Sequence, residues 1–269
     1  MKYLRGKVCL FSLVLLLQAV VPYASQAEEY SKTFEAELFE NNRIYIKLVG
    51  DKYLYRFGEV EWRVLKAGVI EGGGGKEVIL MDVNKNHIND VFVKLFESGA
   101  NNIYALFIAS KKNGAVVFSE YEELFGSPYI NDRGELTSVK RDGPFSVIET
   151  YMIEQGELHR NQTREPINSD LEKVTNFKRQ GKEEFSIKFL GTNISANACV
   201  DASRAYLSNS PSAADVTKAY IVKGDRVSIL DSANNGEWFK VRYHGGHITD
   251  GWLSQAMLSF QGAAECMRD

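Results

Sequence analysis

Oxygen-bearing side chains recur at fixed intervals in residues 82–90, between two apolar segments. Asp82, Asn84, Asn86 and Asp90 occupy the first, third, fifth and ninth positions, and the backbone carbonyl of Ile88 stands at the seventh. This spacing lets the chain curl around one hard cation, and Ca²⁺ takes about six to eight oxygen ligands in flexible geometry. The sequence therefore predicts a calcium site in this loop.

Only two of those side chains carry a formal charge, so we expect weak affinity, suited to calcium near millimolar concentration. The loop is not an EF-hand, because its twelfth position is Val93 where a bidentate glutamate is required. The alternative is a polar hairpin whose asparagine side chains hydrogen-bond their own backbone. The sequence leaves both interpretations open.

The loop resembles the nine-residue calcium loops of FG-GAP/integrin-type β-propeller blades, Asp-x-Asp-x-Asp-Gly-x-x-Asp. It departs from that pattern because Asn84 and Asn86 replace carboxylates and His87 replaces the glycine that eases the turn. Residues 134–143 and 149–158 extend the likeness to bacterial periplasmic FG-GAP-like proteins, which include an inhibitor of a lysozyme-type secreted effector. The resemblance implies a calcium-stabilised, propeller-blade-like β-domain that binds a protein and has no chemistry of its own.

Aromatic residues at alternating positions mark a second segment of interest near the C-terminus. Tyr206 and Tyr243 are amphipathic and lie near turns, so we expect them to line a ligand groove, whereas Trp238 and Trp252 are expected in the core. Residues 200–258 resemble a bacterial SH3 (SH3b) domain, through Lys223-Gly224-Asp225 and Gly251-Trp252-Leu253 among others. The resemblance implies a small SH3-like barrel that binds peptidoglycan or a short peptide.

The elements around both motifs read as β-strands. Short apolar segments alternate with polar residues and are separated by Gly, Asn and Asp turns, such as Lys112-Asn113-Gly114, which is typical of an all-β antiparallel protein. One short helix is expected at residues 169–177. The expected strands include residues 44–49, 77–81, 91–96, 104–109, 115–118, 146–153, 185–189, 226–230 and 238–243.

Residues 1–27 are expected to be a signal peptide. Basic residues precede an apolar stretch from Val8 to Val21, and small residues at 25–27 offer a cleavage site. That stretch is short for a membrane span, although an uncleaved anchor is the alternative. Cleavage would remove three of 32 basic residues and leave 29 against 35 acidic ones, a net charge of −6. No later segment is apolar for long enough to cross a membrane, so we expect a periplasmic or secreted protein.

The two cysteines that follow residue 27, Cys199 and Cys266, are expected to form a disulfide in an exported chain, with two free buried thiols as the alternative. They bracket the C-terminal segment. The expected organisation is therefore a signal peptide (1–27), a calcium-loop β-domain (28–192) and an SH3b-like domain (193–269).

Composition excludes several functions. The whole chain has 269 residues and a net charge of −3, and neither expected domain is basic enough to indicate a nucleic-acid partner. The four histidines do not accompany a G-x-S-x-G motif, and the paired cysteines leave no nucleophile, so we expect no enzymatic activity. The sequence favours an envelope binding protein that inhibits a cell-wall hydrolase, as in immunity. A scaffold or regulator of an endogenous peptidoglycan hydrolase and a peptidoglycan-acting enzyme are the alternatives.

Overall fold

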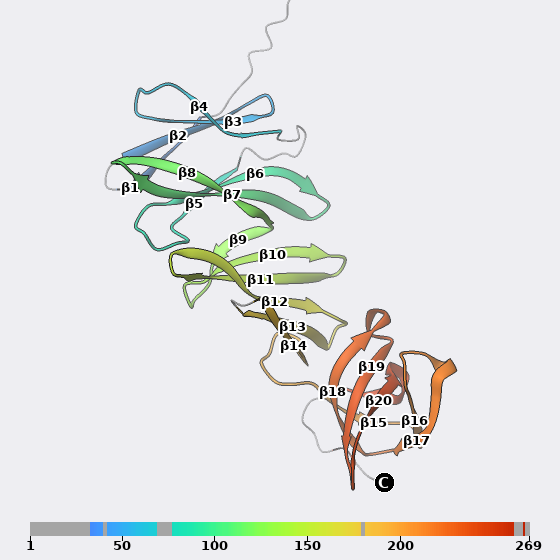
Figure 1. The fold of residues 1–269 in the computed structure, drawn as a ribbon. Helices are drawn as coiled ribbons and strands as arrows, with labels where there is room; N and C mark the ends of the chain where they lie inside the picture. Colours follow the sequence, from blue (N-terminus) through green and yellow to red (C-terminus); the bar gives the residue numbers. More distant parts are fainter. Residues whose placement is uncertain (1–32, 40–41, 69–76, 179–180, 261–265, 267–269) are drawn as a thin grey trace, which may run out of the picture. The chain divides into compact units, whose positions relative to one another are not determined.

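The computed structural model describes residues 33–39, 42–68, 77–178, 181–260 and 266 (Figure 1). The expected signal peptide lies outside the described residues. Within the described ranges the regular elements are antiparallel β-strands and short 3₁₀ turns, without an α-helix, so the all-β prediction is confirmed. None of these elements is a helix long and apolar enough to span a membrane.

Four sheets contain the described strands, and three of them are meanders in which neighbours in sequence are neighbours in space. Sheet A has the order β1 (Thr33–Phe39), β2 (Asn42–Val49), β3 (Lys52–Phe57) and β4 (Arg63–Ala67). Sheet B has the order β5 (Val78–Met81), β6 (Asp90–Ser98), β7 (Asn101–Lys112) and β8 (Ala115–Phe125). Sheet C runs from β9 (Ser127–Ile130) through β10 (Leu136–Asp142), β11 (Phe145–Glu154), β12 (Glu157–Pro166) and β13 (Leu171–Lys178) to β14 (Lys182–Phe189).

Sheet D is a curled sheet of seven strands with the order β17-β16-β20-β19-β18-β15-β21 (Figure 1). Its strands are β15 (Asn197–Val200), β16 (Arg204–Ser208), β17 (Val216–Val222), β18 (Arg226–Ala233), β19 (Trp238–His244), β20 (Ile248–Ser254) and β21 (Leu258–Ser259). Three 3₁₀ turns join them: η1 (Ala213–Asp215), η2 (Asn234–Gly236) and η3 (Gln255–Met257).

Tight turns set the register of the meanders. Asn113 and Gly114, between β7 and β8, both have positive φ values, 53° and 78°. Two successive residues with positive φ define the type I′ turn, whose twist matches that of the flanking strands, and Asn-Gly is its preferred sequence. The turn expected from the sequence at this position therefore fixes the longest hairpin of sheet B.

Strand β6 is buried on both faces because sheet B lies between two apolar cores. Val91 and Val93 belong to the core shared with sheet A, whereas Phe92 belongs to the core shared with sheet C. Successive side chains of a strand point to opposite faces, so a strand between two cores reads as a continuous apolar run. This explains why residues 91–93 are apolar without alternation.

The prediction of a helix at residues 169–177 is wrong, because a β-strand lies there. This segment contains β13, which pairs with β14 from Leu171 opposite Phe189 to Lys178 opposite Lys182. Leu171 and Val174 are fully buried, and the β-branched residues Val174 and Thr175 favour an extended backbone. The pairing with strands on both sides of β13 outweighs the weak helical periodicity of its sequence.

Candidate functional site

The loop at residues 82–90 joins β5 to β6 and is folded by its own side chains. The carboxylate of Asp82 accepts hydrogen bonds from the backbone N–H groups of Asn86 (3.0 Å) and His87 (2.8 Å). The side-chain oxygens of Asn84 and Asn86 accept from the N–H groups of Asn86 (3.2 Å) and Ile88 (2.8 Å). The side-chain oxygens predicted to bind calcium therefore hold the loop in its curled conformation through hydrogen bonds to its own backbone.

Two residues of this loop have left-handed backbone. Lys85 has a φ of 58° and His87 a φ of 66°. A side chain other than glycine adopts this region at a cost of roughly 1–2 kcal/mol. His87 stands where the FG-GAP pattern has its glycine, so the chain adopts there the conformation that glycine would adopt more easily.

Asp90 anchors the end of the loop inside the protein. Its side chain is fully buried, and its two oxygens accept from the N–H groups of Val83 (2.9 Å) and Ala109 (2.7 Å). The amide of Asn86 donates to the carbonyl oxygen of Ala109 (2.8 Å), so both backbone groups of this β7 residue hold the loop. Burial raises the pKa of Asp90 to about 6, and its backbone hydrogen bonds oppose that rise.

The oxygens of this loop suit a hard cation in their chemistry, because they come from carboxylates and amides alone. A carboxylate offers about four lone-pair positions, and each oxygen of Asp82 is used once by the backbone contacts above. Asp90 suits a cation less well, since both of its oxygens already bind buried N–H groups. The loop is thus stable as a hairpin through its own hydrogen bonds and retains acceptor capacity at Asp82.

A second group of interest on sheet D comprises two exposed tyrosines, a half-buried tyrosine and an arginine, which we call the tyrosine surface (Arg204, Tyr206, Tyr220 and Tyr243). Tyr206 of β16 and Tyr220 of β17 are direct cross-strand partners, with ring centroids 5.7 Å apart. Their exposed fractions are 41% and 47%. The guanidinium of Arg204 lies 5.0 Å from the centre of the Tyr220 ring. These rings face water although each could bury a large apolar area.

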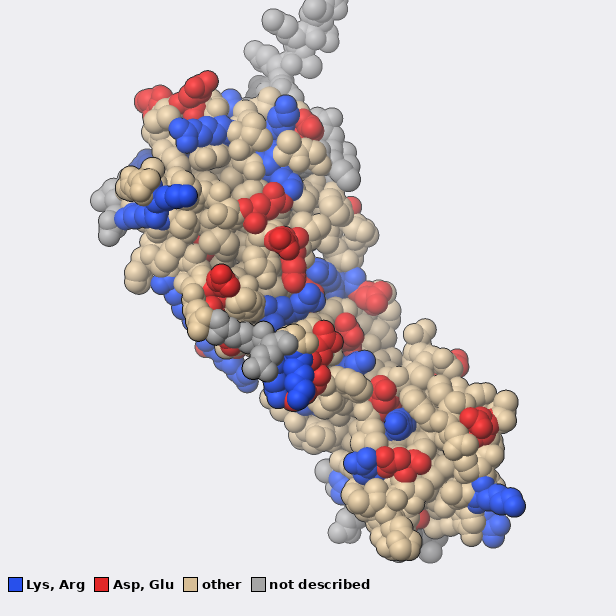
Figure 2. Space-filling view, in the orientation of Figure 1, with Lys and Arg blue, Asp and Glu red and all other residues tan. Residues whose placement is uncertain are grey.

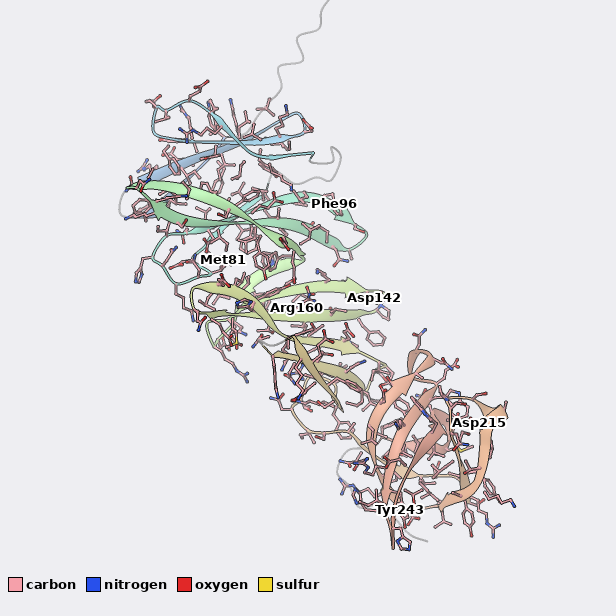
Figure 3. All side chains as sticks on the ribbon, in the orientation of Figure 1. Met81, Phe96, Asp142, Arg160, Asp215 and Tyr243 are labelled. Carbon is pink, nitrogen blue, oxygen red and sulfur yellow. A yellow bond between two sulfur atoms is a disulfide. The ribbon has the colours of Figure 1, made fainter. Side chains whose placement is uncertain are left out.

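Tyr243 joins this surface through a pocket of about 380 Å³, which it lines together with Tyr220, Lys218, His247 and Thr249. Tyr243 lies on β19 (Figure 3) and also packs against the core of sheet D. Of the two tyrosines predicted from the sequence, Tyr206 therefore pairs with Tyr220, and Tyr243 shares a pocket with Tyr220. Tyr220 was not predicted from the sequence. Other residues of β17 also expose apolar side chains, so nothing local distinguishes it.

The two tryptophans of sheet D differ from expectation. Trp238 and Trp252 were expected in the core, but each is half-buried and neither belongs to the buried cluster of this sheet. Phe239 and Leu253, the next residue in each strand, are fully buried in their place. Because strand residues alternate between faces, the tryptophans lie on the face opposite to the core.

A third group was not predicted at all. Arg160 of β12 donates to Glu123 (3.0 Å) and to Glu149 (3.1 Å), and Tyr151 donates to Glu123 (2.9 Å). Lys140 completes this group by donating to Glu149 (2.7 Å). We call these five residues the Arg160 cluster; they come from β8, β10, β11 and β12.

The Arg160 cluster is a closed set of ion pairs rather than a set of reactive groups. Glu149 is buried, and Tyr151 is fully buried at the core between sheets B and C. Burial, with Glu149 and Glu123 beside it, raises the pKa of Tyr151, so its hydroxyl stays protonated and donates. Figure 3 shows Arg160 among the strands of sheet C.

Cys199 and Cys266 form a disulfide, with their Cα atoms 5.5 Å apart and a separation of 67 positions in sequence. Cys199 lies in β15 at the beginning of sheet D, so the bond closes the chain around this sheet. The space-filling view shows acidic and basic side chains interspersed over the face in view (Figure 2).

No protein-family model matches this chain, and no curated protein matches its sequence.

Proposed function

We propose that this protein is an exported, non-catalytic binding protein of the cell envelope that recognises peptidoglycan or a peptide through its tyrosine surface. The observation that supports it best is the exposed cross-strand pair of Tyr206 and Tyr220. Tyrosine offers a large, stiff contact area with a polar hydroxyl, which is why it is enriched at binding surfaces. A sugar ring or a peptide side chain can stack on these rings and enter the pocket beside Tyr243.

The organisation behind this proposal is a propeller-blade-like β-domain at residues 28–192 followed by an SH3b-like barrel at residues 193–269. The meanders of sheets A, B and C support the first part, and the curling of sheet D supports the second. The disulfide supports export, because such bonds persist in oxidising compartments. In this proposal the loop at residues 82–90 binds calcium weakly and stabilises the β-domain.

The sharper form of the proposal is inhibition of a cell-wall hydrolase. The experiment incubates purified mature protein with labelled sacculi, alone and together with a panel of lysozyme-type hydrolases. We expect no release of label by the protein alone and slower release in the presence of at least one hydrolase. Release by the protein alone would contradict the non-catalytic assignment, and unchanged activity of the whole panel would contradict inhibition.

A further inference from the structure

A pocket of about 300 Å³ lies beside the Arg160 cluster. Strands β8, β11, β12 and β13 contribute most of its lining residues, among them Tyr121, Glu123, Met152, Arg160, Asn161 and Phe177. Its walls therefore combine two aromatic rings, a thioether and an amide with the imidazole of His159 and charged groups of both signs. It lies on a different sheet from the tyrosine surface.

Asn161 is the unusual member of this pocket. It has no partner in the pairing of β11 with β12, where the register shifts between Tyr151 opposite Arg160 and Thr150 opposite Gln162. It is thus the extra residue of a β-bulge, a feature that re-aims side chains beside functional sites. Its side-chain oxygen is buried and has no hydrogen-bond partner within the described part of the chain. Such an acceptor costs stability until a donor reaches it.

Arg160 supplies donors next to that acceptor. Its contacts with Glu123 and Glu149 use two of the five N–H groups of a guanidinium. Its guanidinium carbon also lies 5.2 Å from the centre of the Phe177 ring, so its position over this ring is fixed. Asn161 and Arg160 therefore line the pocket next to each other and beside the ring of Phe177, one with an unused acceptor and the other with unused donors.

The charges around the pocket balance. In the Arg160 cluster, Glu123 and Glu149 offset Arg160 and Lys140. Among the side chains that line the pocket itself, the two acidic ones, Glu123 and Glu154, are matched by the two basic ones, Arg160 and Lys178. A site with no surplus charge favours neither a free anion nor a free cation. It suits a neutral, polar ligand.

We propose that this pocket binds the acetamido group of an N-acetylated sugar, with the ligand's N–H donating to the Asn161 side-chain oxygen and its C=O accepting from Arg160. An acetamido group is neutral, carries one donor and one acceptor, and ends in a methyl group that Phe177 and Met152 can cover. The ring of Tyr121 offers a face to the sugar. This site goes beyond the proposed function, because it does not require the tyrosine surface to bind anything.

The direct test is ligand-observed NMR (saturation transfer) on the wild-type protein with three neutral ligands. N,N′-diacetylchitobiose carries both sugar and acetamide, cellobiose has the sugar rings alone, and N-acetylalanine methylamide has the amide alone. We expect saturation of the acetyl methyl of diacetylchitobiose and none of cellobiose. Equal saturation of both disaccharides, or none of diacetylchitobiose, would overturn the proposal. Stronger binding of the amino-acid amide would assign the pocket to peptide in place of sugar.

Asn161→Leu gives a second test, in which the variant is expected to fold as stably as the wild type. Because it removes an unpartnered buried oxygen, we expect the variant's melting temperature to be equal to or above that of the wild type, while affinity for diacetylchitobiose falls roughly tenfold. Phe177→Ala should lower the affinity as well. Phe185→Ala is its matched control, because Phe185 is also an aromatic ring under a cation, 4.4 Å from the Nζ of Lys173, but does not line the pocket. Unchanged affinity in Asn161→Leu would contradict the proposal.

Discussion

The carboxylate of Asp90 accepts a hydrogen bond from the backbone N–H of Ala109, 2.7 Å away, and so ties the loop at residues 82–90 to strand β7. A second oxygen of the same side chain holds the N–H of Val83. This one residue connects the candidate calcium loop to the core between sheets A and B, where Ala109 is buried. The attachment of this loop to the core therefore depends on the Asp90 side chain.

Removal of the Asp90 side chain should destabilise the protein. Asp90→Ala leaves the N–H groups of Val83 and Ala109 buried without acceptors, and each such group costs roughly 1–3 kcal/mol. We expect the free energy of unfolding, measured in urea, to fall by about 2 kcal/mol or more. Asp142→Ala, at an exposed position of β10, is the control and should change it little. Equal effects of the two substitutions would show that Asp90 does not anchor the loop.

When divalent cations are chelated, the pH dependence of the unfolding free energy should include the titration of Asp90. Its pKa is raised from 3.8 to about 6 by burial, so the folded state binds more protons than the unfolded state between these pH values. The stability that Asp90 contributes is therefore greatest below about pH 4 and falls by about 3 kcal/mol as pH rises to 6 and beyond.

The measurement compares wild type with Asp90→Asn in EDTA from pH 4 to pH 7, because the other carboxylates cancel in the difference. The unfolding free energy of the wild type minus that of the variant should decrease as pH rises. A difference that stays constant, or that grows with pH, would contradict a raised pKa at this site.

Calcium should stabilise the protein if the loop binds it. At a calcium concentration tenfold above the dissociation constant, mass action adds about 1.4 kcal/mol to the unfolding free energy. We expect EDTA to lower the melting temperature at pH 7, and Asp82→Ala combined with Asp90→Ala to abolish that sensitivity. An identical melting curve for wild type with calcium and with EDTA would mean that the loop is a hairpin held by its own hydrogen bonds.

The disulfide should stabilise sheet D. A bond that closes a loop of 67 residues lowers the entropy of the unfolded chain by an amount worth about 4 kcal/mol at 25 °C. Replacement of Cys199 and Cys266 by serine should therefore lower the unfolding free energy by up to that amount, with the same result from reduction of the wild type. Free thiols at both positions in exported protein, detected by mass spectrometry, would contradict this account.

Local patterns in the sequence predicted local structure well. The all-β class and the Asn113-Gly114 turn depend on residues adjacent in the chain, and the structure shows both. The helix expected at residues 169–177 failed because β13 is determined by its pairing with the neighbouring strands β12 and β14, which lie outside the segment itself. Whether the loop at residues 82–90 binds calcium stays a prediction.

The Arg160 cluster could not have been predicted from one sequence. Glu123 and Arg160 are 37 residues apart and belong to different sheets, so their contact depends on how sheet B packs on sheet C. The chain has 35 acidic residues, and nothing in their spacing distinguishes Glu123 or Glu149. Tyr220 could have been identified more easily, because its pairing with Tyr206 follows once the register of β16 and β17 is known.

The central claim, that the tyrosine surface recognises the cell wall, is tested most directly by sedimentation of the mature protein with purified sacculi. The comparison is between wild type, a Tyr206→Ala/Tyr220→Ala variant, and Tyr129→Ala, whose tyrosine is 46% exposed on sheet C and lies outside the tyrosine surface. We predict that the double variant binds sacculi roughly tenfold more weakly, a loss of ~1.4 kcal/mol, and that Tyr129→Ala binds as wild type does. Equal binding by all three proteins, or no binding by the wild type, would contradict the account.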